Sequence, residues 1–471
     1  MDLRNLPHHL SSAERCEERR RQIEQECDID LSALQIDPTK LGHAEEQNCE
    51  QMFGHVPIPV GYAGPLPLTF SSGEYADIHL PLATTEGALV ASVNRGCKAL
   101  RLSGGVKTTS VYHGVTRSIA FRRVMVSGDE PSRRQSCRPF DSAQGDMIID
   151  AIEKTCNEWK SIGEATSNHL KILKYDIDTE DDYLFLTIYA DTDEAMGMNM
   201  VTIAAEAIGK WLEQNINRCV TLSGVEERPT IEFITVAANV DSDKKPSERT
   251  HDRGRGYEVT ATATVPADIL QSVLKTTPEN FLEVAHAKLE LGSEIAGAIG
   301  RNCHAANIIA ALYLATGQDP AHVVEGSLAD TIVRWPWFDS AHHDTTNQSN
   351  VSSRAPCHPE RVIPSGVEGR GTRGGTLHIT VRLPALLLGI RGGGTTLPAQ
   401  SQALCLFLPP TPYSLHPRQR LAESIGAAVL ASELSLLAAL SSHSLGKAHQ
   451  NLGRGQKAKR VQRYGSILSC Q

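Results

Sequence analysis

Three short segments carry ionisable side chains of the kinds that transfer protons or stabilise charge. Glu86 follows two threonines in PLATTEG, Asp243 and two lysines precede a proline in DSDKKP, and Asp319 follows Gly317 in ATGQDP. Each has an ordinary structural interpretation: an acid in the first turn of a helix, a solvated charged turn, and a turn after a helix C-cap. Each segment alone is therefore weak evidence of a site.

A dinucleotide-binding motif is the next candidate. Gly369, Gly371 and Gly374 match the pattern G-x-G-x-x-G. In a Rossmann domain this pattern follows a strand and opens a helix, whereas here it lies in a polar stretch and leads into the predicted strand TLHITVRL. We interpret the match as accidental, so any nicotinamide cofactor is bound without a Rossmann domain.

Composition limits the class of protein. The chain has 471 residues, 40% hydrophobic and 21% charged, which is typical of a globular protein of two or three domains. Its formal net charge of −9 opposes nucleic-acid binding. The eleven cysteines include no C-x-x-C pair, which fits a reducing compartment without a zinc ribbon. With no signal-type N-terminus and no uncharged bilayer-length run, we expect a cytoplasmic protein without a membrane partner.

Periodicity predicts helices and strands that do not alternate regularly. Residues 12–48 are charged and predicted helical, and the turn-rich segment 54–68 follows them. Helical patterns cover 85–100, 294–316 and 421–440, the last two with little polar face and therefore predicted as core helices. Period-two alternation predicts strands at 184–188, 259–265 and 377–383. The fold class predicted from this order is α+β.

Two polar stretches interrupt these patterns, at 127–146 and 339–375. Both are rich in Arg, Ser, Pro and Gly and poor in large apolar side chains. They bury too little apolar surface to offset the entropy of ordering, so we predict disordered inserts.

The charged segments belong to a longer ordered series of strings. With TDEAMGMNMVTIAAEAIGKW, GAIGRNCHAANIIAALYLATGQD, LLLGIRGGGTTLP and ELSLLAALSSHSLGKAH, the chain resembles 3-hydroxy-3-methylglutaryl-coenzyme A (HMG-CoA) reductase over about residues 50–120, 180–335 and 376–454. Several rare strings in the right order are far more specific than one glycine motif. The resemblance implies reduction of HMG-CoA to mevalonate and CoA by a nicotinamide cofactor, in isoprenoid biosynthesis.

The resemblance implies four catalytic residues. Reducing a thioester to an alcohol takes two hydride transfers, and each leaves negative charge on a former carbonyl oxygen. Lys244 matches the family lysine that stabilises this charge, and His449 matches the histidine that protonates the departing CoA thiolate. Glu86 matches the glutamate that protonates the nascent alcohol, and Asp319 adjusts the charge balance of the Glu86 and Lys244 pair.

The resemblance also implies binding residues. Those for the hydroxymethylglutaryl part are Arg117, Asp243, Lys245, Lys288, His304 and Asn307. Those for the cofactor are Asn168, Glu194, Met196, Gly197, Met198, Asn199, Gly392 and Gly393. Without the resemblance, we would interpret Lys288 as a surface lysine and the methionines as core residues.

Some positions depart from the family pattern. Glu194 stands where Asp is usual, Ala237 where Ser is usual, and Gln51 where Asn is usual, while Arg391 enters a neutral turn. None of these changes removes a catalytic group.

The cofactor prediction rests on two opposing signals. Met198 in AMGMN is typical of the NADPH-using branch, whereas the NAD-linked catabolic branch usually has Ala there. Asn168 stands where the NADPH branch commonly has an Arg for the 2′-phosphate, with His169 and Lys171 nearby as replacement cations. We predict NADPH, with NADH possible.

The fold implied by the resemblance has three parts. A helical N-terminal domain covers 1–48, a large domain around a central buried helix covers 49–116 and 246–471, and an inserted ferredoxin-like cofactor domain covers 117–238. The family forms its site between subunits, which implies a homodimer or larger homo-oligomer. The alternatives are a relative damaged by its inserts that at most binds CoA, and a catabolic reductase running in reverse.

Overall fold

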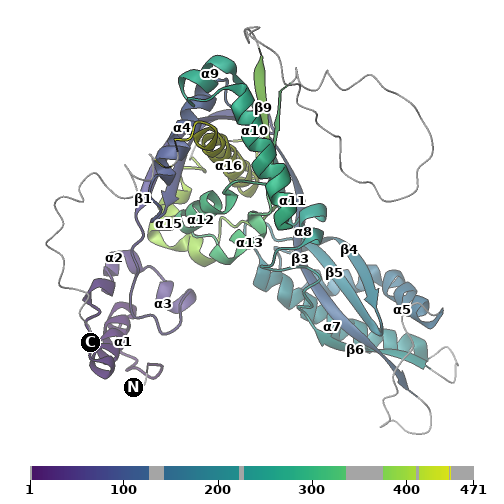
Figure 1. The fold of residues 1–471 in the computed structure, drawn as a ribbon. Helices are drawn as coiled ribbons and strands as arrows, with labels where there is room; N and C mark the ends of the chain where they lie inside the picture. The colour runs from purple at the N-terminus through teal and green to yellow at the C-terminus, as the bar shows by residue number, and fades with distance from the viewer. Residues whose placement is uncertain are drawn as a thin grey trace, which may run out of the picture.

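The computed structural model describes residues 3–126, 143–221, 228–335, 375–409, 413–444 and Gly446. Within these residues helices pack against mixed and antiparallel sheet, which confirms the predicted α+β class. Buried apolar side chains form three separate clusters, so the chain has three cores. Figure 1 shows the corresponding parts, with the N-terminal helices at one end and a sheet with its own helices at the other.

The N-terminal part is small and helical. It contains α1 (Ser12–Cys27), η1 (Ser32–Leu34), α2 (Pro38–Leu41) and α3 (Ala44–Gln47). Ser11 and Glu14 form a capping box that starts α1. Its core has only four buried members among the described residues, so the ion pair between Arg19 and Glu45, at 2.8 Å, contributes to joining α1 to α3.

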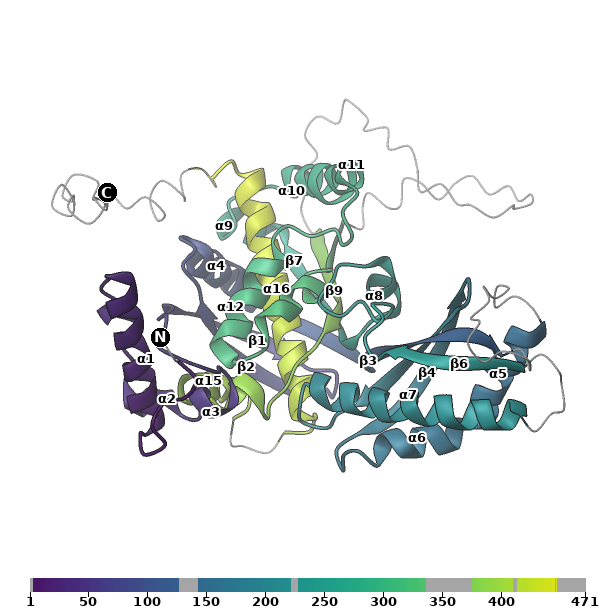
Figure 2. The same cartoon turned by 90° about the horizontal axis from the view of Figure 1, so that it is seen from below.

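The largest core is built around one sheet and one helix. The sheet has the order β2-β1-β3-β7-β9-β8. Its strands are β1 (Val60–Thr69), β2 (Tyr75–Ala83), β3 (Val106–Val126), β7 (Gly256–Pro266), β8 (Asp330–Arg334) and β9 (Thr376–Leu386). In Figure 2 the helix α16 (Pro417–Ser441) runs through the middle of this part. Strands β7 and β9 include two of the predicted strands.

Helix α16 is buried on nearly every side. Among the described residues it alone is long and apolar enough to cross a membrane, and 89% of its apolar window is buried within the protein. A helix that is apolar all round belongs in a core when other elements surround it. Helices α4 (Leu89–Leu102) and α12 (Ala305–Thr316) pack against it. The predicted burial of 421–440 is therefore confirmed.

A second sheet carries the middle of the chain. Its order is β6-β3-β5-β4, all antiparallel, with β4 (Lys171–Glu180), β5 (Tyr183–Asp191) and β6 (Arg228–Thr235). Helices α5 (Ala143–Lys154), α6 (Cys156–Glu164) and α7 (Met198–Thr221) complete a βαββαβ order, the ferredoxin-like arrangement. Figure 2 shows α6 and α7 together on one face of this sheet.

Strand β3 belongs to both sheets. Gly114 pairs with Gly256 of β7, and the next residue, Val115, pairs with Ala190 of β5. Gly114 has a φ of 89°, in the left-handed region that favours glycine. The strand therefore changes partners at a local irregularity, and this junction brings the two large cores together.

Short helices and turns connect these elements. They are α8 (Glu248–Arg253), α9 (Ala267–Ser272), α10 (Pro278–Ala285), η2 (His286–Gly292), α11 (Ser293–Ala296), η3 (Pro320–His322), α13 (Val323–Gly326), η5 (Gly393–Thr396) and α15 (Pro398–Leu404).

Several predicted boundaries are wrong. The helix expected over 294–316 is broken, because Gly297 and Gly300 have φ values of 64° and 83° and α12 begins only at 305. Glu86 does not start a helix: α4 begins three residues later, and the Glu86 N–H donates to Thr84 Oγ1 at 3.0 Å. Helix α5 begins at 143, inside the first predicted insert. The remainder of that insert to 142, and 339–374, lie outside the described residues.

Candidate active site

Lys244 and Asp319 form an ion pair at the edge of the large core. Lys244 Nζ lies 2.8 Å from Asp319 Oδ2, and both side chains are partly exposed, at 40% and 30%. Asp319 follows α12 and Gly317, whose φ of 71° makes the predicted C-cap. Asp319 Oδ1 accepts the Ala321 N–H at 3.0 Å and so caps η3. A cation is thus held at the surface while its partner is fixed by local backbone.

The backbone around Lys244 is unusual. Lys244 has a φ of 57°, and Asn239 and Ser242 also have positive φ values, of 63° and 53°. Non-glycine residues in this region persist where surrounding contacts hold them, and they cluster at functional sites. The Lys244 N–H donates to Glu325 Oε1 at 3.2 Å, which is one of these contacts.

A buried charge network lies beneath the pair. Arg255, only 1% exposed, donates to Glu325 Oε1 at 2.6 Å and to Asp243 Oδ1 at 3.0 Å. Arg117 approaches Asp243 Oδ2 at 3.2 Å and Asp241 Oδ2 at 3.4 Å. Two arginines are therefore shared among three carboxylates, and buried charges of this kind persist only when paired. We call Arg117, Asp243, Lys244, Arg255, Asp319, His322 and Glu325 the lysine cluster.

The network changes the acidity of its carboxyl groups. Burial raises the pKa of Asp241 above its usual range, although Arg255 and Arg117 oppose the rise. Burial also acts on Asp243, but Arg255, His322 and Arg117 outweigh it and leave the pKa of Asp243 lowered. Partial burial would likewise raise the pKa of Asp319, yet the hydrogen bond from Lys244 and other contacts leave that pKa lowered.

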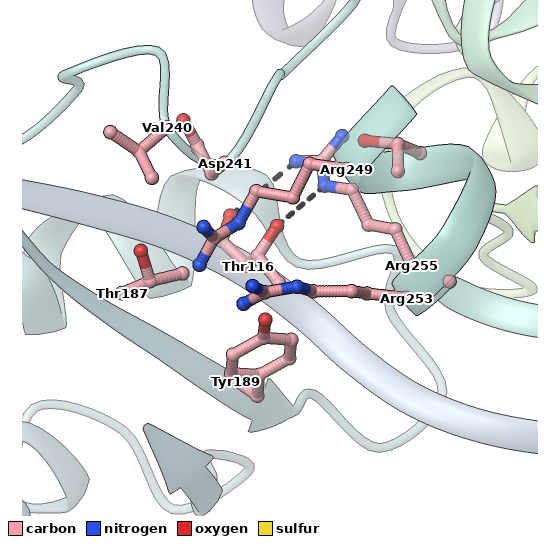
Figure 3. Close-up of a pocket in the computed structure, with 10 residues that line it drawn as sticks. Thr116, Thr187, Tyr189, Val240, Asp241, Arg249, Arg253 and Arg255 are labelled. Carbon is pink, nitrogen blue, oxygen red and sulfur yellow. Dashed lines mark hydrogen bonds between the residues drawn. The ribbon is translucent and has the colours of Figure 1, made fainter. Parts of the chain in front are cut away.

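Figure 3 shows the side of this network that faces the ferredoxin-like sheet. Arg255 Nε donates to Thr116 Oγ1 of β3 at 2.7 Å, and Arg249 and Arg253 of α8 point into the same small pocket. Both of these arginines contact Asp176 of β4, at 3.3 and 3.2 Å. Their charges are therefore already used to join α8 to the second sheet.

A second group of predicted residues gathers elsewhere. Asn307 Nδ2 donates to Glu86 Oε2 at 2.7 Å, which joins the two side chains. His304 precedes α12, and its Nε2 lies 2.6 Å from Ser432 Oγ. Burial raises the pKa of Cys303, with Lys288 among the groups that oppose the rise, so Lys288 also lies near this end of α12. We call Glu86, Lys288, His304 and Asn307 the glutamate cluster.

The two clusters lie at opposite ends of one helix. Asn307 is in the first turn of α12, whereas Asp319 follows its last residue, Thr316. A helix of this length spans roughly 18 Å at about 1.5 Å per residue. Glu86 and the pair of Lys244 and Asp319 are therefore not brought together within one chain.

The cofactor segment predicted at 194–199 packs against the turn at 389–393. Glu194 O accepts the Ile390 N–H at 2.9 Å, and Ala195 forms a parallel bridge with Arg391. The Glu194 and Arg391 side chains also form an ion pair. Met196 lies near the backbone of this turn, since a Cβ on Gly389 would lie 2.7 Å from Met196 N. Two segments about 200 residues apart in sequence thus form one surface.

The opening of α7 carries the other predicted cofactor residues. Met198 begins α7 and is buried, whereas Asn199 is exposed. A Cβ on Gly197, at a φ of 89°, would lie 2.3 Å from the Thr192 side chain. Met198 Sδ is 3.3 Å from Arg255 NH2, so this segment borders the lysine cluster. Gly392 and Gly393 have positive φ values and open space where a Cβ would be, which leaves their backbone accessible.

A buried arginine of α16 holds the same segment. Arg418 NH1 donates to Ala195 O at 3.1 Å and to Thr192 Oγ1 at 3.2 Å, and NH2 pairs with Asp191 Oδ1 at 2.7 Å. Its guanidinium lies 5.0 Å from the centre of the Tyr112 ring. The central helix therefore contacts the loop that precedes α7.

The residues predicted for the 2′-phosphate lie on the surface. Asn168, His169 and Lys171 are all exposed, at the turn before β4 and at its first residue. His169 Nδ1 lies 3.0 Å from Asp193 Oδ2, which places this turn beside the 194–199 segment. Lys245 is exposed, and its Nζ donates to Asp243 O at 3.1 Å. His449 lies outside the described residues.

Four buried ionisable groups of the lysine cluster or its border were not predicted from the sequence: Asp241, Arg255, His322 and Glu325. Their partners are distant in sequence, as Arg255 and Glu325 are 70 positions apart. The spacing of Asp319, His322 and Glu325, three residues each, is a signal that could have indicated one shared face.

The sequence profile of the hydroxymethylglutaryl-coenzyme A reductase family matches residues 15–454. The HMG-CoA reductase of Methanothermobacter thermautotrophicus is 35% identical over 456 residues, covering 96% of this chain and 97% of that protein. The reductase of Pyrococcus abyssi is 36% identical over 449 residues, covering 93% and 92%.

Solved structures agree on the fold. An HMG-CoA reductase from Streptococcus pneumoniae aligns over 90% of this chain and 84% of that chain, with a TM-score of 0.54 and 17% identity. A class II reductase structure from the same organism, bound to NADPH in open conformations, aligns over 90% and 96% with a TM-score of 0.51 and 18% identity. This chain and these structures therefore share one α+β fold, in which two sheets are joined through β3 and the helix α16 lies in the larger core. The chain belongs to the HMG-CoA reductase family.

Proposed function

We propose that this chain reduces (S)-HMG-CoA to (R)-mevalonate and CoA, using two equivalents of NADPH, in the mevalonate pathway. The observation that carries the proposal is the pair of Lys244 and Asp319, 2.8 Å apart, on a strained loop above a buried charge network. The family match over residues 15–454 supports the reaction. The pairs at Lys244 and Glu86 are both formed, which disfavours a damaged non-enzymatic relative.

Residues of the chain fit a nicotinamide cofactor. The segment 194–199 and the glycines at 392 and 393 present accessible backbone beside the start of α7. When bound, the reduced nicotinamide supplies one hydride to the thioester carbon and a second equivalent supplies one to the aldehyde. Glu194, Met196, Gly197, Met198 and Asn199, with Gly392 and Gly393, would hold it.

The side chains then handle charge and protons. The Lys244 ammonium donates to the substrate carbonyl oxygen, where negative charge develops at each hydride transfer. Asp319 holds Lys244 in place. Collapse of the hemithioacetal breaks the carbon–sulfur bond, and His449 protonates the CoA thiolate. Glu86 donates the proton to the final alkoxide, so two hydrides and two protons account for the products.

We also propose that the working site contains two subunits. The lysine and glutamate clusters lie about a helix length apart within one chain, too far to act on one carbonyl. A second copy that presents its glutamate cluster to the lysine cluster of the first would complete the site, and a twofold axis would form two such sites. Arg117, Lys245, Lys288, His304 and Asn307 would then bind the hydroxymethylglutaryl part from both sides.

The arrangement has a direct test. Glu86→Gln and Lys244→Ala should each lose most activity on HMG-CoA and NADPH, roughly 100-fold or more, because each removes a group from the reacting centre. Equal co-expression of the two variants should restore about a quarter of wild-type activity, since half of the dimers carry one intact site. Absence of recovery despite mixed dimers would contradict a shared site.

Lys244→Ala has a close control. Lys245→Ala should raise KM for HMG-CoA more than it lowers kcat, because Lys245 is placed at the substrate rather than at the reacting oxygen. Lys244→Ala should also abolish reduction of added mevaldehyde, where the oxyanion forms again. A near-normal rate on mevaldehyde would remove Lys244 from its proposed role.

We propose the cytoplasm as the location, since the apolar α16 is a core helix and the described cysteines are free. We further propose domain limits of 1–48, then 49–116 with 246–471, then 117–238, in line with the three separate cores.

A further inference from the structure

The partner of the proposed catalytic lysine is itself backed by a buried histidine. His322 Nε2 lies 3.7 Å from Asp319 Oδ2, and His322 Nδ1 lies 2.9 Å from Glu325 Oε1. The His322 and Glu325 side chains are completely buried. An imidazole therefore lies between two carboxylates, one partly exposed and paired with Lys244, the other in the interior.

The local sequence produces this alignment. Asp319, His322 and Glu325 are spaced three residues apart along η3 and α13, and side chains at this spacing share one face of a tight helix. Pro320 begins η3, and Asp319 caps it through Oδ1. Oδ2 of Asp319 is left to face both Lys244 and His322.

Hydrogen-bond accounting indicates what the ring does. Carboxylate oxygens only accept, so each ring nitrogen of His322 can interact favourably with its neighbour only by carrying a proton. Nδ1–H is within hydrogen-bond distance of Glu325. Nε2 is buried with no hydrogen-bond partner among the described residues, and it lies 3.7 Å from the Asp319 carboxylate. The ring therefore fills the space between Glu325 and Asp319.

Other charged groups also lie close to the ring. Asp243 also lies close, since one ligand atom from each of Asp243, His322 and Glu325 falls within 4.8 Å of the others. This triplet has ligand types that suit a metal, but Arg255 already donates to both of its carboxylates. Because Arg255 already pairs with both carboxylates, a divalent ion at this triplet would add like charge beside the guanidinium, so the triplet does not suit a metal.

We propose that His322, anchored by Glu325, is a positioning residue that keeps Asp319 aligned on Lys244 during both hydride transfers. This inference rests on the proposed function of Lys244. Glu325 holds the two ends of the arrangement at once, since its Oε1 accepts from His322 and from the Lys244 N–H. The ring thus links the backbone and the side-chain partner of the same lysine.

The test compares two histidines that both lie between carboxylates. His322→Gln removes the imidazole ring and keeps a polar side chain of similar length. His251→Gln is the matched control, because His251 lies 2.7 Å from Asp330 and 3.0 Å from Asp252, outside both clusters. Activity is measured on HMG-CoA and on mevaldehyde across pH, with the melting temperature of each variant.

We expect His322→Gln to lower kcat roughly 10- to 100-fold on both substrates, with KM for HMG-CoA changed less than about twofold, because misplacement rather than lost binding is the defect. The acidic limb of the kcat profile should move to higher pH, since Asp319 loses one of the groups that lower its pKa. His251→Gln should leave the rate and the acidic limb unchanged.

A lowered melting temperature with normal kcat and an unmoved acidic limb would overturn the proposal. If His322→Gln does not fold, Glu325→Gln serves in its place, because it keeps the volume while weakening the anchor, and it should lower kcat with the same pH signature. Failure of the wild type to reduce HMG-CoA would instead refute the proposed function, which separates the two ideas.

Discussion

Two regions of the candidate site, the lysine cluster (the lysine side) and the segment 194–199 (the cofactor side), each contact a buried arginine, and these two arginines lie in different surroundings. Arg255, beneath Lys244, pairs with the carboxylates of Asp243 and Glu325, and Glu325 is completely buried. Arg418 beside the cofactor segment lies against tyrosine rings and pairs with Asp191, which is 42% exposed. The lysine side is thus a closed charge network, whereas the cofactor side is a single cation among aromatic rings and backbone oxygens.

The difference concerns what each arginine leaves behind when it is lost. A fully buried carboxylate without its cation has no access to water, so its charge becomes a large penalty. A half-exposed carboxylate can be hydrated again, and backbone carbonyls lose only hydrogen bonds. We infer that the lysine side is rigid, because separating its buried charges would cost much free energy. The loop before α7 can move at a smaller cost in free energy.

The largest expected effect is on stability at Arg255. Arg255→Met should lower the free energy of unfolding by about 3–5 kcal/mol, because Glu325 and Asp243 lose their shared cation. Urea denaturation followed by circular dichroism measures it. Adding Glu325→Gln to Arg255→Met should recover part of the loss, since the buried charge is then removed. If Arg255→Met lowers the free energy of unfolding by less than about 1 kcal/mol, the network is hydrated and the contrast drawn between the two regions is wrong.

A smaller effect is expected at Arg418. Arg418→Met should lower the free energy of unfolding by about 1–3 kcal/mol, through lost hydrogen bonds and ring contacts. It should also raise KM for NADPH, because the guanidinium no longer holds Ala195 and Thr192.

Arg420→Met is the control for that second effect. Arg420 is equally buried on α16, lies 4.4 Å from the Phe70 ring and pairs with Glu74, without contacting the cofactor segment in the described structure. It should lower stability similarly and leave KM for NADPH unchanged. Equal KM changes in both variants would show that α16, rather than Arg418, governs the loop.

The same contrast explains what could be predicted from sequence. The apolar patterns of α16, β7 and β9 predicted these elements correctly, because burial on every side, or on one face, follows directly from residue type. The partners of Arg255 could not be predicted, because they come from segments whose approach depends on the whole sheet. The break at Gly297 was missed because a glycine-rich pattern resembles a continuous helix until its φ values are known.

Two of the departures from the family pattern, Glu194 and Arg391, are explained by the structure. Glu194 and Arg391 were noted separately in the sequence, yet their side chains form an ion pair across the cofactor surface. Arg391 is 78% exposed, so the pair adds little stability. The acid at 194 and the cation at 391 are therefore partners in this chain, although they are far apart in sequence.

The smallest expected effect lies at the exposed rim of the cofactor side, where no buried charge is at stake. Asn168 is the position that we propose for contact with the 2′-phosphate, and the neighbouring His169 ring already contacts Asp193. Lys171 is exposed and forms no ion pair with the other described residues, so we propose it as the replacement cation. Asn168→Arg should raise the preference for NADPH over NADH on the order of tenfold, or about 1.4 kcal/mol, while Lys171→Ala should lower it. The measurement is kcat/KM with each cofactor, and Asn168→Gln serves as the uncharged control.

Neither change should move the melting temperature, because solvated side chains carry no desolvation penalty. An unmoved cofactor ratio in Asn168→Arg would show that this turn does not reach the 2′-phosphate, and the cation for that group would then have to come from another part of the cofactor surface.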